Sequence, residues 1–109
     1  LKLNLNNNNI GSGGASKIAN ALDVNTSLHT LVLSYNQSLA NTLLTNTTLL
    51  TLDLKCNKII PEGINCIINS LFTNSSLRSL NLGYNIIDKE SVSLISKLLR
   101  TTTTLQALG

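Results

Sequence analysis

Aromatic and charged residues are both scarce in this chain. Its 109 residues include no tryptophan, one phenylalanine and two tyrosines, and charged residues make up 12% of the sequence with a formal net charge of +3. A nucleic-acid interface usually combines a basic cluster with aromatic residues placed between the cations. The cations here are few and scattered along the sequence. We therefore expect no nucleic-acid partner.

Long apolar runs and metal-ligand clusters are missing as well. No stretch is long enough to span a bilayer and no signal-peptide pattern is present. With one histidine, His29, and two cysteines, Cys56 and Cys66, a zinc site would lack ligands. The two cysteines fall at opposite ends of one crossover between strands, which disfavours a disulfide and predicts reduced thiols in an intracellular, cytoplasmic setting. We expect no membrane contact, metal or cofactor.

Two patterns resemble catalytic motifs but are incomplete. His29 and Cys56 suggest a nucleophile pair, yet no third group that would orient the base accompanies them. The run Gly11-Ser12-Gly13-Gly14 matches neither the phosphate-binding loop nor the dinucleotide-binding loop. We therefore predict no catalytic residue and no enzyme activity.

What the chain does have is an internal repeat. The pattern L-x-x-L-x-L-x-x-N occurs at residues 28–36, 49–57 and 77–85. The asparagines are spaced by 28 residues from Asn8 to Asn36, by 21 to Asn57 and by 28 to Asn85. A period of this size is typical of a stacked solenoid. The short unit lacks seven residues just after Asn36, which predicts a truncated helix near residues 38–45 between neighbouring strands at 30–34 and 51–55.

Each part of the repeat has a predicted structure. The leucines of L-x-L are two apart, so they point to the same interior face of a strand. The long return segment forces neighbouring strands to be parallel. Apolar residues spaced i, i+3, i+4 and i+7 predict helices in that segment, namely Ala15, Ile18, Ala19 and Leu22, then Ile64, Ile67, Ile68 and Leu71, and then Val92, Ile95 and Leu99 with Ser96 in the third place.

Two sets of asparagines have a structural interpretation. Asn8, Asn36, Asn57 and Asn85 are predicted to form a ladder of side-chain bonds to backbone groups where the strands bend. Loss of one such group costs roughly 1–3 kcal/mol. Asn25, Asn46 and Asn74 begin the turns before the next strand. These three match the N-x-[ST] acceptor pattern, and we expect glycan access at all three if the protein were secreted. Asn36 matches it too but should be buried.

The chain resembles the leucine-rich repeat family, in its 28-residue ribonuclease-inhibitor-like subclass. The resemblance rests on the motif L-x-x-L-x-L-x-x-N-x-I, on the glycines Gly14 and Gly63, and on the helical motif I-x-x-x-L. The resemblance implies a right-handed α/β horseshoe with a parallel sheet on the concave side and helices outside. Ser91 replaces the glycine in the last unit. We expect one domain over residues 1–109, with units at about 1–27, 28–48, 49–76, 77–104 and 105–109, taken from a longer chain.

The residues that do not repeat are the candidates for function. The positions between and beside the strand leucines should face a partner on the concave side. Tyr35 and Tyr84 are the best anchors, because tyrosine is common at binding hot spots, although partial packing against a neighbouring loop explains them equally well. The predicted protein-binding residues are Lys2, Asn4, Asn6, Thr30, Val32, Ser34, Tyr35, Thr51, Asp53, Lys55, Ser79, Asn81 and Tyr84.

The leading function is a non-catalytic protein–protein interaction module, since a rigid parallel stack lowers the ordering cost of binding. Two alternatives remain. One is a GTPase-activator-like regulatory solenoid, which would need a positioned polar residue on the loops after the strands. The other is the recognition arm of a larger effector or enzyme whose catalytic domain lies outside this segment.

Overall fold

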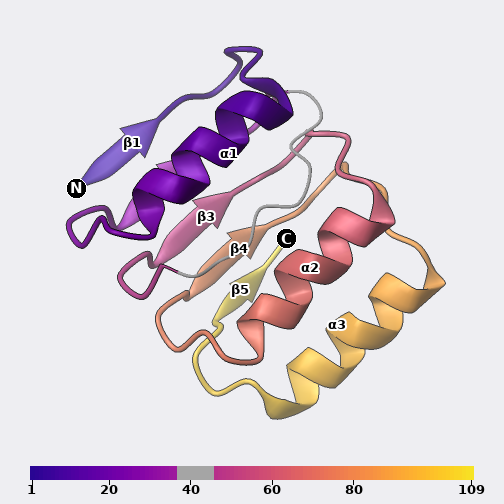
Figure 1. The fold of residues 1–109 in the computed structure, drawn as a ribbon. Coiled ribbons are helices and arrows are strands. Elements are labelled where there is room, and N and C mark those ends of the chain that lie inside the picture. Colours follow the sequence, from indigo (N-terminus) through magenta and orange to yellow (C-terminus); the bar gives the residue numbers. More distant parts are fainter. Residues whose placement is uncertain (37–45) are drawn as a thin grey trace.

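The computed structural model describes residues 1–36 and 46–109. A five-stranded sheet forms one layer and three helices form the other (Figure 1). The predicted short helix near residues 38–45 falls outside the described residues. The elements are β1 (Lys2–Asn4), α1 (Gly11–Leu22), β2 (Thr30–Val32), β3 (Thr51–Asp53), α2 (Pro61–Leu71), β4 (Ser79–Asn81), α3 (Lys89–Thr101) and β5 (Ala107–Leu108).

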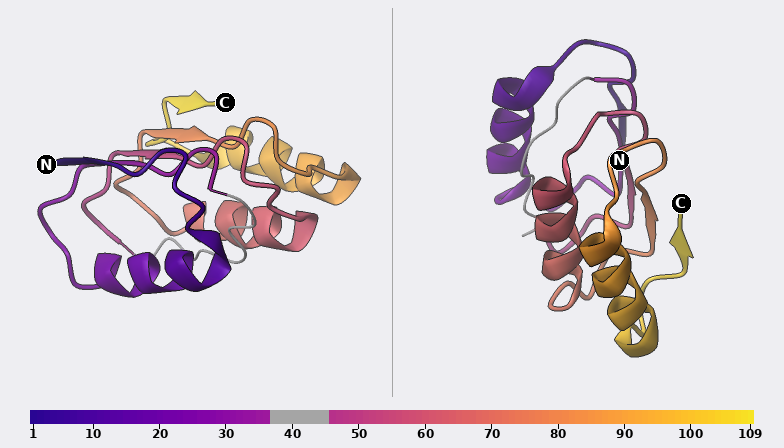
Figure 2. Two further views of the ribbon diagram at one scale, coloured as in Figure 1. Left: turned by 90° about the horizontal axis from the view of Figure 1, so that it is seen from above. Right: turned by 90° about the vertical axis from the view of Figure 1, so that its right-hand side faces the viewer.

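The sheet is parallel throughout and follows the order β1-β2-β3-β4-β5. The register matches repeat to repeat, with Leu31 opposite Leu52 and Leu52 opposite Leu80. β2 pairs directly with β3. This confirms the prediction that the strands on either side of the short unit are neighbours. Figure 2 shows that all three helices lie on the same side of the sheet, which leaves the other face open.

The core lies between the sheet and the helices. The L-x-L leucines of the three inner strands point into it and are at most 2% exposed, namely Leu31, Leu33, Leu52, Leu54, Leu80 and Leu82. The prediction that they share one interior face is confirmed. Helix α2 contributes Ile64, Ile67 and Ile68, each at most 1% exposed.

The last helix departs from the predicted stripe. Val92 and Leu99 are 53% and 59% exposed, although Ile64 at the position equivalent to Val92 is fully buried. Helix α3 packs on α2 and buries Leu98 and Ser91 instead. The reason is that α2 is covered by α3 on its far side, whereas no further helix of the described chain covers α3 (Figure 1).

Local chemistry explains where the helices begin. Pro61 occupies the first position of α2, where its missing N–H is not needed. Asp88 caps α3 by accepting a hydrogen bond of 2.8 Å from the Ser91 N–H. The Ser91 hydroxyl also lies 2.7 Å from Asn65 Oδ1 on α2, so the serine that replaces the repeat glycine joins the two helices.

The predicted asparagine ladder follows the bend after each inner strand. Asn57 donates from Nδ2 to the Leu33 and Leu54 carbonyls at 3.0 and 2.9 Å, and its Oδ1 accepts from the Asn36 N–H at 2.6 Å. Asn36 and Asn85 repeat these contacts. Asn8 is different: its backbone N–H joins the ladder through Asn36 Oδ1, but its exposed side chain bonds only the Asn6 carbonyl among the described residues.

A second asparagine ladder lies in the turns that precede the strands, at the amino-terminal ends of β2, β3 and β4. The sequence pattern had indicated separate turns there. Asn46 donates from Nδ2 to the Leu22 and Asn25 carbonyls, and Asn74 donates to the Asn46 carbonyl. In each of these turns the side-chain oxygen accepts from the backbone two and three residues later. Asn46 is 4% exposed, so the expected glycan access at this position is wrong.

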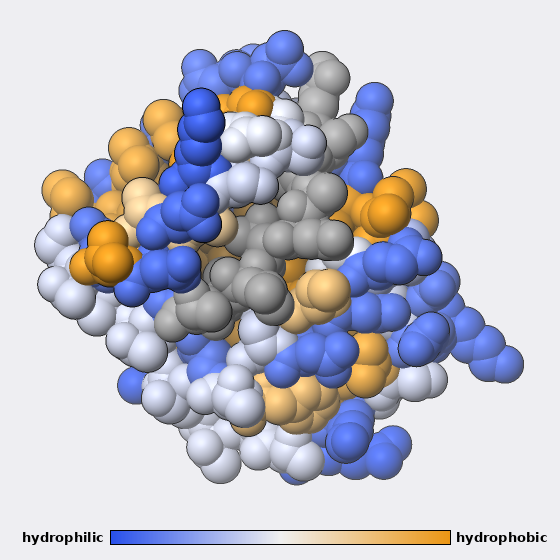
Figure 3. Space-filling model, viewed as in Figure 1, coloured by the Kyte–Doolittle hydropathy of each residue, from blue (hydrophilic) through white to orange (hydrophobic). Residues whose placement is uncertain are grey.

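The helix side of the molecule carries a mixed surface, with hydrophilic residues and separate hydrophobic patches (Figure 3). Within residues 1–36 and 46–109, none of the helices combines the length and the apolar character needed to cross a bilayer.

Candidate functional site

The open face of the sheet is lined by small side chains in two rows. Thr30, Thr51 and Ser79 stand side by side in the pairing register, and so do Val32, Asp53 and Asn81. All six are half-buried, whereas the flanking Lys2, Asn4 and Asn6 are exposed. Ser34 does not belong to this face, because it is only 3% exposed. Its predicted role as a partner contact is therefore wrong.

Three polar residues of this face have a structural task. At the end of their strands, Asn4, Asp53 and Asn81 each accept through Oδ1 a hydrogen bond of 3.0 Å from the backbone N–H two residues later. Such bonds hold the chain as it leaves the strand. One side-chain oxygen of each of these predicted contact residues is thus already engaged in holding the backbone.

A row of four side chains lies just past the strands, and we call it the rim row: Asn7, Tyr35, Cys56 and Tyr84. Each immediately precedes Asn8, Asn36, Asn57 or Asn85, the asparagines that repeat at the bend after the strands. Each has a positive φ, of 57°, 59°, 58° and 56° respectively. Left-handed backbone is unfavourable for residues with a Cβ. Hydrogen bonds between neighbouring units hold it here, from the N–H groups of Asn7, Tyr35 and Cys56 to the Ser34, Lys55 and Gly83 carbonyls at 2.9–3.0 Å.

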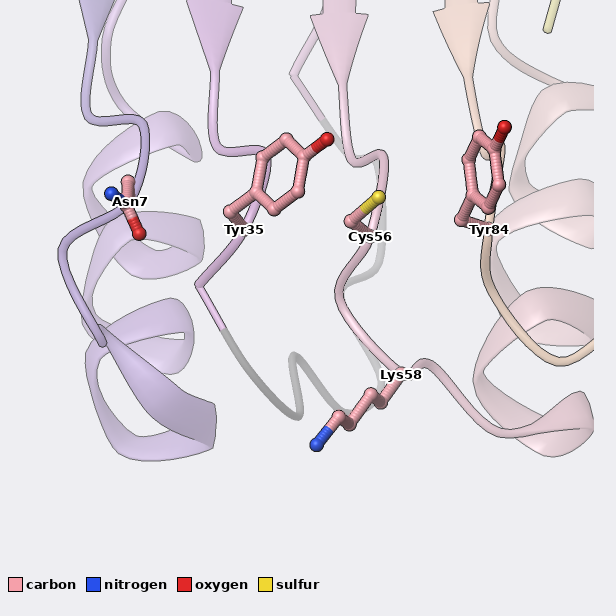
Figure 4. Close-up of a pocket in the computed structure, with 5 residues that line it drawn as sticks. All are labelled: Asn7, Tyr35, Cys56, Lys58 and Tyr84. Atoms are coloured by element: carbon pink, nitrogen blue, oxygen red, sulfur yellow. The ribbon is translucent and has the colours of Figure 1, made fainter.

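The rim row and Lys58 enclose an open cleft of about 360 Å³. Figure 4 shows Tyr35 and Tyr84 on either side of Cys56, with the Tyr35 hydroxyl directed toward the Cys56 loop. The hydrogen bond between the Cys56 thiol and Tyr35 raises the pKa of the Tyr35 phenol above its ordinary value of 10.0. Tyr35 therefore stays protonated and neutral at physiological pH.

The ring of the second tyrosine, Tyr84, contacts a lysine. The Lys55 ammonium lies 5.2 Å from the centre of the Tyr84 ring, within the range of a cation–π contact. Tyr35 is 50% exposed and Tyr84 is 81% exposed. Neither ring is part of the core, and half of Tyr35 and most of Tyr84 remain open to solvent.

The structure adds residues that the sequence reading missed. Cys56, Asn7 and Lys58 line the cleft, but Cys56 was considered only for catalysis, zinc binding and disulfide formation. The signal was available, because residues 7, 35, 56 and 84 all occupy the position before a ladder asparagine. Both cysteines are free thiols. In the described parts of the chain, no three His, Cys, Asp or Glu side chains gather where they could hold a metal ion.

Comparison with known proteins gives a family and a structural neighbour. The family model described as Leucine Rich repeat matches residues 1–19, 24–42, 45–67 and 73–96. Among solved structures, one titled "Leiomodin-1 Actin-Binding Site 2 (ABS2)" is similar, with 29% sequence identity, a TM-score of 0.87, and coverage of 99% of this chain and 68% of that one. No curated protein sequence matches.

Proposed function

The chain belongs to the leucine-rich repeat family, in which it is a protein-interaction module with an α/β solenoid fold, and we propose that its partner binds on the open sheet face and the rim row. The observation that carries this proposal is the pair of exposed tyrosines, Tyr35 and Tyr84. The Tyr35 N–H donates to the Lys55 carbonyl of the next unit, and the residues on either side of Tyr84, Gly83 and Asn85, accept hydrogen bonds from the preceding unit. Rigid, exposed aromatic side chains are the usual anchors of protein interfaces because little freedom is lost on binding.

Actin is the first partner to test. The similar solved structure is titled as an actin-binding site, and it covers nearly all of this chain at 29% identity. We expect the purified chain to bind either monomeric or filamentous actin, measured by fluorescence titration and by cosedimentation. Absence of binding to both forms would remove actin as a candidate.

A matched pair of variants tests the site itself, with actin or any partner recovered by pull-down. Tyr35→Ser combined with Tyr84→Ser should abolish binding. The control uses a second aromatic–lysine contact on the helix side, where the Lys97 ammonium lies 5.5 Å from the Phe72 ring, and Phe72→Ser combined with Lys97→Ala should bind normally. Circular dichroism must show both proteins folded. Equal recovery by the two variants would contradict the proposed site.

The asparagines of the first ladder bear on the GTPase-activator alternative. A regulator that acts on a GTPase would need a positioned polar residue on the loops after the strands, and Asn57 and Asn85 are the positioned asparagines there. Both use their amide oxygen and nitrogen for hydrogen bonds within the solenoid. We therefore favour a non-catalytic binding role for this segment, alone or as the recognition arm of a larger effector.

Several finer assignments accompany this proposal. We assign the chain to the ribonuclease-inhibitor-like subclass from the separation of 28 residues between partners in the ladder, as for Asn57 and Asn85. Units starting near residues 28, 49, 77 and 105 agree with the repeating strand register. Two reduced thiols, Cys56 and Cys66, favour an intracellular setting.

A further inference from the structure

We propose that the cleft between Tyr35 and Tyr84 binds an acidic segment of a partner protein, with an apolar side chain seated over Cys56 and a carboxylate beside Lys58. This inference rests on the proposed protein-binding function and adds the chemistry of the partner. It concerns the rim of the loops, where Tyr35, Tyr84 and Lys58 are large and exposed, in contrast to the small side chains of the sheet face.

The shape of the cleft argues for an apolar side chain between the rings. Tyr35 and Tyr84 follow strands that are separated by one other strand, so their backbones are about 10 Å apart. Cys56 lies between them and presents a small, weakly polar thiol (Figure 4). The two rings on either side of the thiol give this part of the cleft apolar surface for a leucine-sized side chain, whereas Asn7 and Lys58 make the rest of the described lining polar.

The charge of the cleft argues for a neighbouring carboxylate. Of the five described side chains that line it, Lys58 carries a positive charge and none carries a negative one. Lys55 adds a second cation at the Tyr84 ring. The acidic residue nearest in sequence, Asp53, has its Oδ1 bonded to the Lys55 N–H at the end of β3. An acidic segment would therefore meet two lysines and two tyrosines, whereas a basic segment would meet like charge.

The chain contains a built-in reporter for this cleft. It has two tyrosines and no tryptophan, and both tyrosines line the cleft, so the intrinsic emission of the folded protein comes from this site apart from the weak signal of Phe72. We would titrate it with three blocked pentapeptides that contain a central leucine flanked by glutamates, by glutamines or by lysines. The glutamate peptide should change the tyrosine emission and bind most tightly, and added salt should weaken it.

Charge-reversal variants locate the binding. Lys58→Glu should weaken the glutamate peptide by about three- to tenfold, as expected for reversing an exposed charge pair, and should strengthen the lysine peptide. Lys97→Glu on α3 is the matched control and should change neither. Replacing the central leucine of the glutamate peptide by glycine should also weaken binding, because the seat over Cys56 is then left empty.

Any one of three results would overturn the proposal. They are equal binding of the glutamate and glutamine peptides, an unchanged affinity in Lys58→Glu, or no change in emission with the glutamate peptide up to about 10 mM, the weak end of measurable affinities. If these occur while Tyr35→Ser with Tyr84→Ser still abolishes partner binding, the acidic chemistry is wrong and the proposed binding site stands. If that double variant instead binds its partner normally, the proposed function fails at this site as well.

Discussion

Changing Asn57 to alanine tests how the solenoid is held together. The side chain is completely buried, and it contacts backbone groups of two repeat units. Its two acceptor carbonyls, Leu33 and Leu54, each keep a second donor, from Asn36 and Asn85 respectively. The Asn36 N–H loses the partner that the structure gives it. One buried donor is thus left unpaired, and two further hydrogen bonds are lost.

The magnitude follows from these contacts. An unpaired buried N–H costs about 1–3 kcal/mol, and each hydrogen bond whose acceptor keeps another donor costs about 0.5–1 kcal/mol. Together they lower the free energy of unfolding by about 2–5 kcal/mol. This exceeds the estimate from sequence, which counted a single unsatisfied group, because one side chain serves two units at once.

Urea unfolding followed by circular dichroism measures the change, and an unaltered dependence on urea would indicate that the variant still unfolds in the same way. Amide exchange at Asn36 should quicken in the same variant, since that N–H loses its acceptor. Asn8→Ala is the internal control. It occupies the same repeat position, but its side chain is exposed and, among the described residues, bonds only the Asn6 carbonyl, so we expect a change within about 0.5 kcal/mol. Similar losses for Asn57→Ala and Asn8→Ala would refute the ladder argument.

Two further predictions use other contrasts within the chain. Ile59 is 1% exposed and Ile87, 28 positions later, is 43% exposed, so Ile59→Ala should lower the free energy of unfolding by about 2–5 kcal/mol and Ile87→Ala by clearly less in the same urea assay. Hydrogen bonds from the Ser91 N–H and hydroxyl hold the pKa of Asp88 below its ordinary value of 3.8, so its contribution is present above the unfolded pKa and lost as pH falls through the folded value. The stability advantage of the native protein over Asp88→Ala should therefore shrink in acid and persist at neutral pH.

Much of the fold was readable because each repeat position has a fixed environment. The leucines of L-x-L predicted the buried face of the strands, and the aligned asparagines predicted the inner ladder. The prediction failed where a unit lacks a neighbour on one side. Val92 and Leu99 match buried residues of α2 in sequence but remain exposed, since burial of a helix in a solenoid depends on the next helix. Asn8 differs from Asn57 for the same reason, because no earlier strand of the described chain receives its amide.

The site was only partly predictable for a different reason. Tyr35 and Tyr84 stood out by residue type, whereas Cys56 and Asn7 share only their repeat position with them, and the left-handed backbone brings all four to one rim. Ser34 alternates with the strand leucines in the same way as Thr30 and Val32, which placed it on the open face by pattern. The chain has already begun to bend there, and the residue is buried.

The two asparagine ladders also limit how such a chain can change in length during evolution. In the short unit both spacings are 21 residues, from Asn36 to Asn57 and from Asn25 to Asn46, whereas both are 28 in the unit that follows. The whole deletion therefore lies between Asn36 and Asn46, and the strand with its two bends keeps its full length. Insertions or grafted peptides should be accepted in a return segment, which leads from an asparagine of the first ladder to the next turn asparagine. A single residue added in a strand segment, between Asn46 and Asn57, would instead shift one ladder against the other.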